Sequence, residues 1–228
     1  MKYTIDKSVT ELGITNPVLF IIHGISKIKD TPKGVADEGK IVLKEINNNI
    51  ENHLAKPEVT GFNEVFSKMG YENVIPAGER LVRTFSEKGM KSYGPIIDSY
   101  NITAMKYSAG IGMHDASNLD ENSTITIDRA TGAETIIPLF KEKPKRLRKG
   151  DLFYGTPNSP IAWLGKRDVD SDEYKVISDT SKILLVILGN KNTSEEYNTS
   201  IAHDIYNRMR SFSPAADLIR IKNSIQTT

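Results

Sequence analysis

The sequence predicts an α+β fold, with helices in the front part, strands in the middle and one closing helix. Apolar residues recur at helical spacing up to about residue 107, and strand-like alternation begins near residue 124. A last helical stripe covers residues 197–212. Such segregation is typical of α+β domains rather than of regularly alternating α/β domains. Because no repeat, linker or compositional break divides the chain, we expect a single domain over residues 1–228.

The front part contains a buried strand followed by helices. Residues Val18–Ile22 are β-branched or otherwise apolar and lie between Pro17 and Gly24, which indicates a buried strand. Helical stripes then predict one helix through Val42, Ile46, Ile50 and Leu54 that ends before Pro57. A second helix is expected through Phe62, Phe66 and Met69, ending at Gly70, and a third through Leu81, Val82 and Phe85, ending at Gly89. A fourth is expected over Asp98–Tyr107.

The second part is rich in strands. Thr124–Asp128 and Thr135–Phe140 flank a Thr131-Gly132 turn, and this pattern predicts a β-hairpin. Further strands are expected at Leu152–Tyr154, Ile161–Leu164 and Ile183–Leu188. Thr193 or Ser194 offers an N-cap for the closing helix, whose apolar face comprises Tyr197, Ile201, Ile205, Met209 and Phe212.

Composition excludes several classes of function. The 30 Lys and Arg residues almost balance the 29 Asp and Glu residues, so any polyanion must bind a local patch rather than the global field. The absence of cysteine excludes disulfides, thiol nucleophiles and cysteine-held metals. The first residues lack a signal-peptide run and no apolar stretch could cross a bilayer, so we expect a cytoplasmic protein without a membrane partner. No nucleotide, dinucleotide or metal motif appears, and we expect no cofactor.

Two local patterns suggest a site. Gly110–Asp115 contains two glycines and the pair His114-Asp115, which could orient a water or a hydroxyl group; a tight turn capped by Asp115 is the alternative. The other pattern is the basic run Lys141–Lys149, which could hold a phosphate backbone or simply be a solvated hairpin loop. Its candidate phosphate-binding residues are Lys143, Lys145, Arg146, Arg148 and Lys149.

Several segments together resemble one family. Ile97–Ile102 followed by Gly110–Asp115 is similar to the pattern Val-Asp-x-Thr-Asn and Gly-x-Pro-x-His-x-x-Asp of the tRNA-editing domain in the bacterial phenylalanyl-tRNA synthetase beta chain. Ile125–Glu134 resembles the hairpin of that domain, and Lys149–Tyr154 the strand that follows. The segments Gly61–Phe66 and Gly78–Arg83 resemble free-standing relatives of the domain, so that the resemblance covers residues 57–212, with residues 1–56 as an extension packed on it.

The resemblance implies a three-layer β/β/α domain with a β-sandwich-like core, formed in the synthetase by its third and fourth modules. There the domain binds the acylated end of tRNA and hydrolyses the ester when tyrosine replaces phenylalanine. Tyr100, Asn101, Gly112, Asp115 and Glu134 match family positions at the pocket, which Arg129 and Arg167 would also line. The candidate catalytic residues are Asp115 and His114, which lies two residues after Gly112. Gly112 replaces the family's histidine, and Ile183–Leu188 lacks the glutamate that the family places at the end of this strand.

Three functions remain open from the sequence. The first is a tRNA-binding protein, with tRNA or aminoacyl-tRNA as partner and with ester hydrolysis in trans as a further possibility, but without ligase activity of its own. The second is a small-molecule sensor or carrier that uses the same pocket, and the third is a module that docks onto a synthetase. No sequence-specific DNA binding is expected. For Arg129 and Arg167, ion pairs with Asp98, Asp115 or Glu134 are the structural alternative to a role in the pocket.

Overall fold

The computed structural model describes residues 1–157 and 159–224 of the chain. Its strands are β1 (Lys2–Ile5), β2 (Val18–His23), β3 (Ile111–Asp115), β4 (Thr124–Arg129), β5 (Thr135–Ile136), β6 (Lys145–Arg146), β7 (Leu152–Thr156), β8 (Ser159–Leu164), β9 (Val169–Asp170), β10 (Lys182–Ile187), β11 (Asp217–Arg220) and β12 (Lys222–Asn223). Its helices are α1 (Lys7–Leu12), α2 (Lys33–Asn47), α3 (Ile50–Leu54), α4 (Pro57–Lys68), α5 (Ala77–Lys88), α6 (Pro95–Tyr107), the 3₁₀ turn η1 (Asp172–Tyr174) and α7 (Glu195–Arg210).

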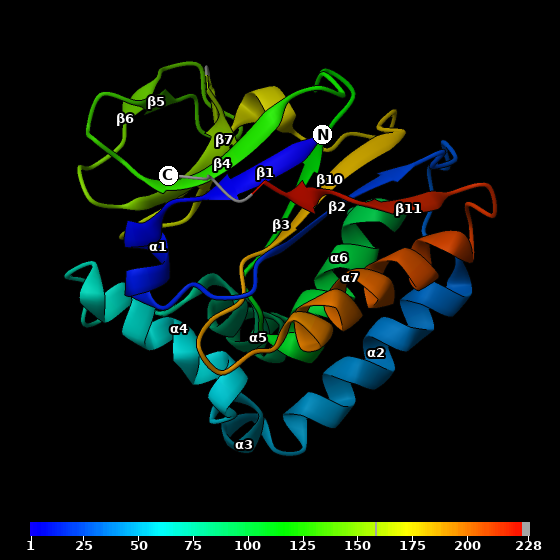
Figure 1. Ribbon diagram of the computed structural model, residues 1–228. Helices are drawn as coiled ribbons and strands as arrows, with labels where there is room; N and C mark the ends of the chain where they lie inside the picture. The colour runs from blue at the N-terminus through cyan, green and yellow to red at the C-terminus, as the bar shows by residue number, and fades with distance from the viewer. Residues whose placement is uncertain (158, 225–228) are drawn as a thin grey trace.

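The elements form three layers, with two sheets stacked above a layer of helices (Figure 1). The first sheet has six strands in the order β12-β1-β4-β7-β8-β9, and the second has four in the order β11-β2-β10-β3. Helices α6 and α7 pack on the free face of the four-stranded sheet. This arrangement confirms the α+β prediction and its β/β/α layering.

The four-stranded sheet is covered on both faces, which explains the continuous apolar runs of β2 and β10. Leu184 and Val186 of β10 face the six-stranded sheet and pack with Ile125. Ile183 and Leu185, which alternate with them, face the helices instead. One strand therefore contributes to two cores, because successive side chains point to opposite faces.

The front helices form a third core below the sheets. Val82 of α5 and Ile102 of α6 are fully buried there against α2. The prediction of one helix through Leu54 was wrong, because the chain leaves the helical conformation at Asn49 and starts α3 anew. The side chain of Asn49 accepts a hydrogen bond from the Asn52 amide at 3.4 Å, a capping role that asparagine prefers over a helix interior. Within residues 1–157 and 159–224, no helix is long and apolar enough to cross a bilayer.

The predicted hairpin of Thr124–Asp128 with Thr135–Phe140 is not formed. β4 pairs with β1 and β7, whereas Thr135–Ile136 pairs with Lys145–Arg146. Alternation identified strand-forming residues, but it carries no information on which neighbour completes the hydrogen bonds.

Residues 1–56 are more than an extension packed on the domain. They supply β1, an interior strand of the six-stranded sheet, and β2, an interior strand of the four-stranded sheet. β1 runs parallel to β4, with Ile5 beside Ile127. Both sheets therefore depend on the N-terminal segment.

The two ends of the stacked sheets differ. At the end that we call the closed edge, the chain passes from β11 through Ile221 into β12 and so joins both sheets. Ile221 is 3% exposed, and its amide donates to the Leu19 carbonyl at 2.8 Å. At the other end, the open edge, β3 and β9 are the last strands, and no strand within residues 1–157 and 159–224 joins them.

Candidate functional site

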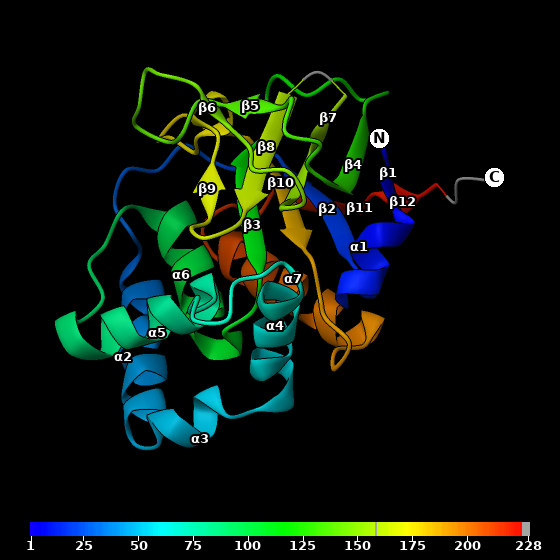
Figure 2. The same cartoon turned by 90° about the vertical axis from the view of Figure 1, so that its left-hand side faces the viewer.

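A cavity of about 530 Å³ lies at the open edge, between β3, β9 and the helices α5 and α6. Figure 2 shows these four elements close together, on the side of the molecule that faces the viewer. The cavity is lined mainly by apolar and aromatic side chains with a few polar groups, which is the usual make-up of a small-ligand site. The lining residues are Leu81, Phe85, Tyr93, Ile97, Tyr100, Asn101, Ile111, Met113, His114, Leu139, Phe140, Asp170, Ser171, Tyr174, Lys175 and Val176.

One row of paired residues runs across the six-stranded sheet, from its core to this cavity. Ile127 pairs with Tyr154, Tyr154 with Ala162, and Ala162 with Asp170. Paired residues in a sheet point to the same face, so Asp170 follows Tyr154 and Ala162 toward the inside of the stacked sheets. The row is apolar in the core and ends in a carboxylate at the cavity.

His114 is part of the cavity wall and is held by Tyr154. The His114 Nε2 and the Tyr154 hydroxyl oxygen lie 2.6 Å apart in a hydrogen bond, and His114 is only 1% exposed. Burial lowers the pKa of His114 to about 3, so the imidazole is neutral at pH 7. A neutral imidazole can take part in hydrogen bonding, but with this pKa it is a weak general base.

Gly112 leaves the space that this pair of side chains occupies. A Cβ atom on Gly112 would lie 1.8 Å from the Tyr154 hydroxyl oxygen and 2.7 Å from His114 Nε2. The position where the resembling family has a histidine is therefore filled here by a tyrosine from another strand.

Helix α6 adds Tyr100 and Asn101 to the wall. The Tyr100 hydroxyl donates to the Ile111 carbonyl at 3.3 Å, and burial raises the pKa of this tyrosine. Asn101 is buried, and its side-chain amide forms no hydrogen bond to another described residue. The amide is thus free to bind a ligand. The helix begins with Pro95 and is anchored by Asp98, which accepts a hydrogen bond from the Tyr93 amide at 2.9 Å.

Five predicted site residues are not part of the cavity lining: Gly112, Asp115, Arg129, Glu134 and Arg167. Asp115 accepts from the Ser117 amide at 2.7 Å and from the Thr180 hydroxyl, which is the turn-capping role. Glu134 accepts from the amides of Thr131 and Gly132 and closes the turn after β4. Arg129 Nε donates to the Gly150 carbonyl at 3.0 Å, and Arg167 is exposed in the β8–β9 loop. Among the described residues, neither arginine forms an ion pair with a carboxylate.

The basic run forms an exposed hairpin beside the cavity. Its strand β6 pairs with β5, and Leu147 anchors it in a small core with Ile136. The Arg148 guanidinium lies over the Tyr71 ring, 4.8 Å from its centroid. Lys143, Lys145, Arg146, Arg148 and Lys149 are all exposed, and none has a carboxylate within 4.0 Å in the part of the chain that is described.

Asp168 and Asp170 were not among the site residues predicted from the sequence. Burial raises the pKa of Asp168 to about 6, although Arg80 Nη2 lies 3.4 Å from its Oδ2 and acts in the opposite direction. Water reaches Asp170 at the cavity mouth, but the surrounding protein still removes enough hydration to raise its pKa to about 6. The spacing of two carboxylates at Asp168 and Asp170, on one side of an extended segment, was the available signal.

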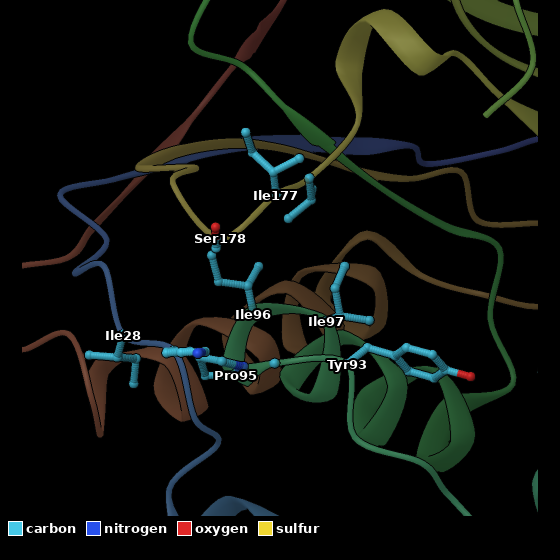
Figure 3. A pocket seen from close by; sticks show the side chains of 10 residues that line it. Ile28, Tyr93, Pro95, Ile96, Ile97, Ile177 and Ser178 are labelled. Carbon is cyan, nitrogen blue, oxygen red and sulfur yellow. The ribbon is translucent and has the colours of Figure 1, made fainter. Parts of the chain in front are cut away.

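A smaller cavity of about 110 Å³ adjoins the first, and Tyr93, Ile97 and Val176 line both. Figure 3 shows Ile96 and Ile97 from α6 together with Ile177 from the segment before β10. Its wall is mainly apolar, with Lys29 and Ser178 among the lining residues. Within the described residues, no three His, Asp or Glu side chains gather at a distance that would hold a metal ion.

Comparisons with known proteins agree with this architecture. A family model described as the B3/4 domain matches residues 64–211. The phenylalanine–tRNA ligase beta subunit of Geobacter sulfurreducens is 31% identical over 113 residues, which is 50% of this chain and 14% of that protein. The crystal structure of an N-terminal fragment of the phenylalanyl-tRNA synthetase beta subunit from Pyrococcus horikoshii matches with a TM-score of 0.53 and 10% identity, over 98% of this chain and 52% of the fragment. The likeness to that structure concerns the fold alone.

Proposed function

The chain belongs to the B3/4 domain family, and from this premise we propose that it binds the aminoacylated end of tRNA. The curated relative is by name a ligase of phenylalanine and tRNA, and this chain spans only 14% of its length. The proposal therefore concerns recognition of the product and not the ligation itself. In it, the cavity at the open edge receives the aminoacyl group, and the basic hairpin binds the phosphates.

One observation carries the proposal, which is the continuity between cavity wall and basic surface. Leu139 and Phe140 line the cavity, and Lys141 follows directly as the first residue of the basic run. The Lys175 Nζ lies 5.3 Å from the centroid of the Phe140 ring, so a cation also stands at the cavity mouth. A ligand with a small apolar end and a phosphate chain fits a cavity that opens toward unpaired cations.

Binding suits the cavity better than strong base catalysis. His114 is neutral and weakly basic, and Asp115 is engaged in a turn. Ester hydrolysis in trans would have to rely on a bound water and the hydroxyl of the tRNA itself. We therefore treat hydrolysis as an outcome to be measured alongside binding.

The experiment measures the affinity of the protein for aminoacylated and uncharged tRNA at several salt concentrations. The test variant replaces Lys145, Arg146 and Lys149 by alanine, and the control variant replaces Lys33, Lys40 and Lys44 of α2. Both variants lose three exposed cations, but α2 lies at the opposite end of the molecule from β5 and β6 (Figure 1). We expect the test variant to reduce the slope of log affinity against log salt by about 2, because each phosphate contact contributes roughly 0.7–0.9.

The cavity is tested separately with Phe140→Ala. We expect this change to weaken binding of aminoacylated tRNA and to leave binding of uncharged tRNA within about twofold, since only the acyl group enters the cavity. Loss of the ester over time is followed in the same samples. The proposal fails if the protein binds neither tRNA, or if the test and control variants change the salt slope equally. Binding of free amino acids without tRNA would support a small-molecule carrier instead.

A further inference from the structure

Asp170 brings a carboxylate into the cavity without a partner of opposite charge. Its position is fixed by pairing, because Ala162 lies beside it in β8 and the neighbouring Tyr154 points to the same inner face. The carbonyl of Asp170 accepts from the Leu139 amide at 2.9 Å, which holds the strand to the loop at the cavity mouth. Within the described residues, the carboxylate itself has neither a hydrogen bond nor an ion pair, and it lines the cavity.

Two cations of this region, Lys175 and Arg80, are engaged with other carboxylates. Lys175 lines the cavity, but its Nζ lies 3.0 Å from Asp172 Oδ1 and over the Phe140 ring. Arg80 is directed to Asp168, with 3.4 Å between Nη2 and Oδ2. The other carboxylate oxygen of Asp168 is buried and has no hydrogen-bond partner. The region therefore holds more negative charge than its described neighbours neutralise.

The remaining polar groups of this wall are uncharged. Burial raises the pKa of Tyr154 and the negative charge of Asp170 raises it further, which also places the two groups near each other. The same two causes act on Tyr100. His114 is neutral because its pKa is lowered to about 3. The cavity thus presents hydroxyl and imidazole groups around the unpaired Asp170 carboxylate, which lies among mainly apolar lining residues and is reached by water.

We propose that Asp170 binds the ammonium group of the ligand, so that the cavity selects acyl groups with a free primary amine. This inference rests on the proposed function and names the part of the ligand that the cavity recognises. An aminoacyl ester carries a single cation at its α-carbon, and it would supply the charge that Asp170 lacks. A charge-assisted hydrogen bond of this kind is about twice as strong as a neutral one. Deaminated or N-acylated counterparts would leave Asp170 unpaired and bind more weakly.

The experiment uses two stable probes that differ only in the amine. One is adenosine with phenylalanine attached at the 3′ position through an amide, and the other carries phenylpropionyl at the same position. Affinities are measured by calorimetry for the unmodified protein, Asp170→Asn and the control Glu142→Gln. Glu142 is an exposed carboxylate on the β5–β6 loop, so its change removes the same charge outside the cavity.

We expect the unmodified protein and Glu142→Gln to prefer the amine by about tenfold, which corresponds to about 1.4 kcal/mol. Asp170→Asn should reduce this preference to less than about twofold, because it weakens the binding of the probe with the amine and leaves the binding of the phenylpropionyl probe unchanged. Thermal unfolding of each variant establishes that it is folded. The inference is overturned if the unmodified protein binds both probes equally, or if Asp170→Asn weakens both to the same extent. Failure of the proposed function differs from this, since then neither probe binds the unmodified protein.

Discussion

The closed edge and the open edge end the same stacked sheets in opposite ways. At the closed edge, one continuous segment joins both sheets and buries Ile221 between them, with the Ser224 amide donating to the Tyr3 carbonyl at 2.7 Å. At the open edge, β9 contains only two residues and leaves room for a cavity beside β3. The wall of this cavity includes the polar residues His114 and Asp170, whereas the closed edge buries the apolar Ile221.

The difference shows how one fold separates stability from binding. An apolar residue that seals a sheet edge gains free energy from burial, whereas an ionisable group that loses part of its hydration costs free energy unless it is paired. Groups such as Asp170 are therefore tolerated where a ligand can reach them. The following variants test whether the closed edge contributes more to stability than the open edge does.

The largest effect is expected at the closed edge, from Ile221→Ala. Removing this 3% exposed side chain leaves a cavity in the core shared by the two sheets, and we expect a loss of about 3 kcal/mol in the free energy of unfolding. The control is Ile219→Ala, two residues earlier on β11 and 50% exposed, with a loss of less than about 0.5 kcal/mol. Urea unfolding measures both. Similar losses for the two variants would contradict the role of Ile221 as a seal.

A smaller loss is expected at the open edge, from Gly112→Ala. The new Cβ would overlap the Tyr154 hydroxyl and crowd His114, so the hydrogen bond between them must break or shift, at a cost of about 2 kcal/mol. Gly34→Ala in α2 is the matched control, because nothing lies within 4 Å of its added Cβ. Urea unfolding should show the control unchanged or slightly stabilised. If Gly112→Ala is as harmless as the control, the Tyr154 and His114 side chains can move apart without a loss of stability, which contradicts tight packing of this wall.

The smallest effect has the opposite sign and comes from Asp168→Asn. Burial raises the pKa of Asp168 to about 6, so the folded state holds the proton more tightly than the unfolded state. The stability that this proton provides is present at low pH and is lost as the pH rises from about 4 through 6. The asparagine avoids this loss, and we expect a gain of about 1 kcal/mol at pH 8, after the contact with Arg80 is given up.

The pH series distinguishes this account from a general effect of charge. The gain from Asp168→Asn should shrink below pH 6 and be absent near pH 4, whereas Asp179→Asn should show less than about 0.5 kcal/mol at every pH. The side chain of Asp168 is 22% exposed and that of Asp179 is 69% exposed. A destabilised Asp168→Asn at pH 8 would mean that the ion pair with Arg80 outweighs the cost of burial.

The helices were the most predictable part of the fold. Apolar spacing with Gly70 and Gly89 located the ends of α4 and α5, and Ser194 caps α7 by accepting from the Tyr197 amide. Strands β1 and β12 were missed, because four and two residues are too short for a periodic signal. Strand partners were not predictable either, since pairing is decided by packing between distant segments.

The site was predictable only where a motif is local. The motifs that contain Asn101 and His114 lie on α6 and β3, and the fold brings both to one cavity. Arg129 and Glu134 were assigned by position in a resembling family, but local turn contacts engage them here. The spacing of Asp168 and Asp170 indicates that both lie on one side of the segment, but only the pairing of Asp170 with Ala162 shows that this side faces the cavity. The functional role of all these residues stays a prediction until the variants are measured.

The pairing register of the short strand β9 decides whether the cavity contains a carboxylate. Val169 and Asp170 point to opposite faces, and Val169 packs outward in the small core with Trp163. Inserting one residue in the loop 165–168 would place Val169 opposite Ala162, so that a valine would face the cavity and the carboxylate would leave it. Relatives with the same composition but a different loop length would then present a neutral cavity. Ligand preference within the family could thus change by a shift of one position, without any substitution inside the cavity.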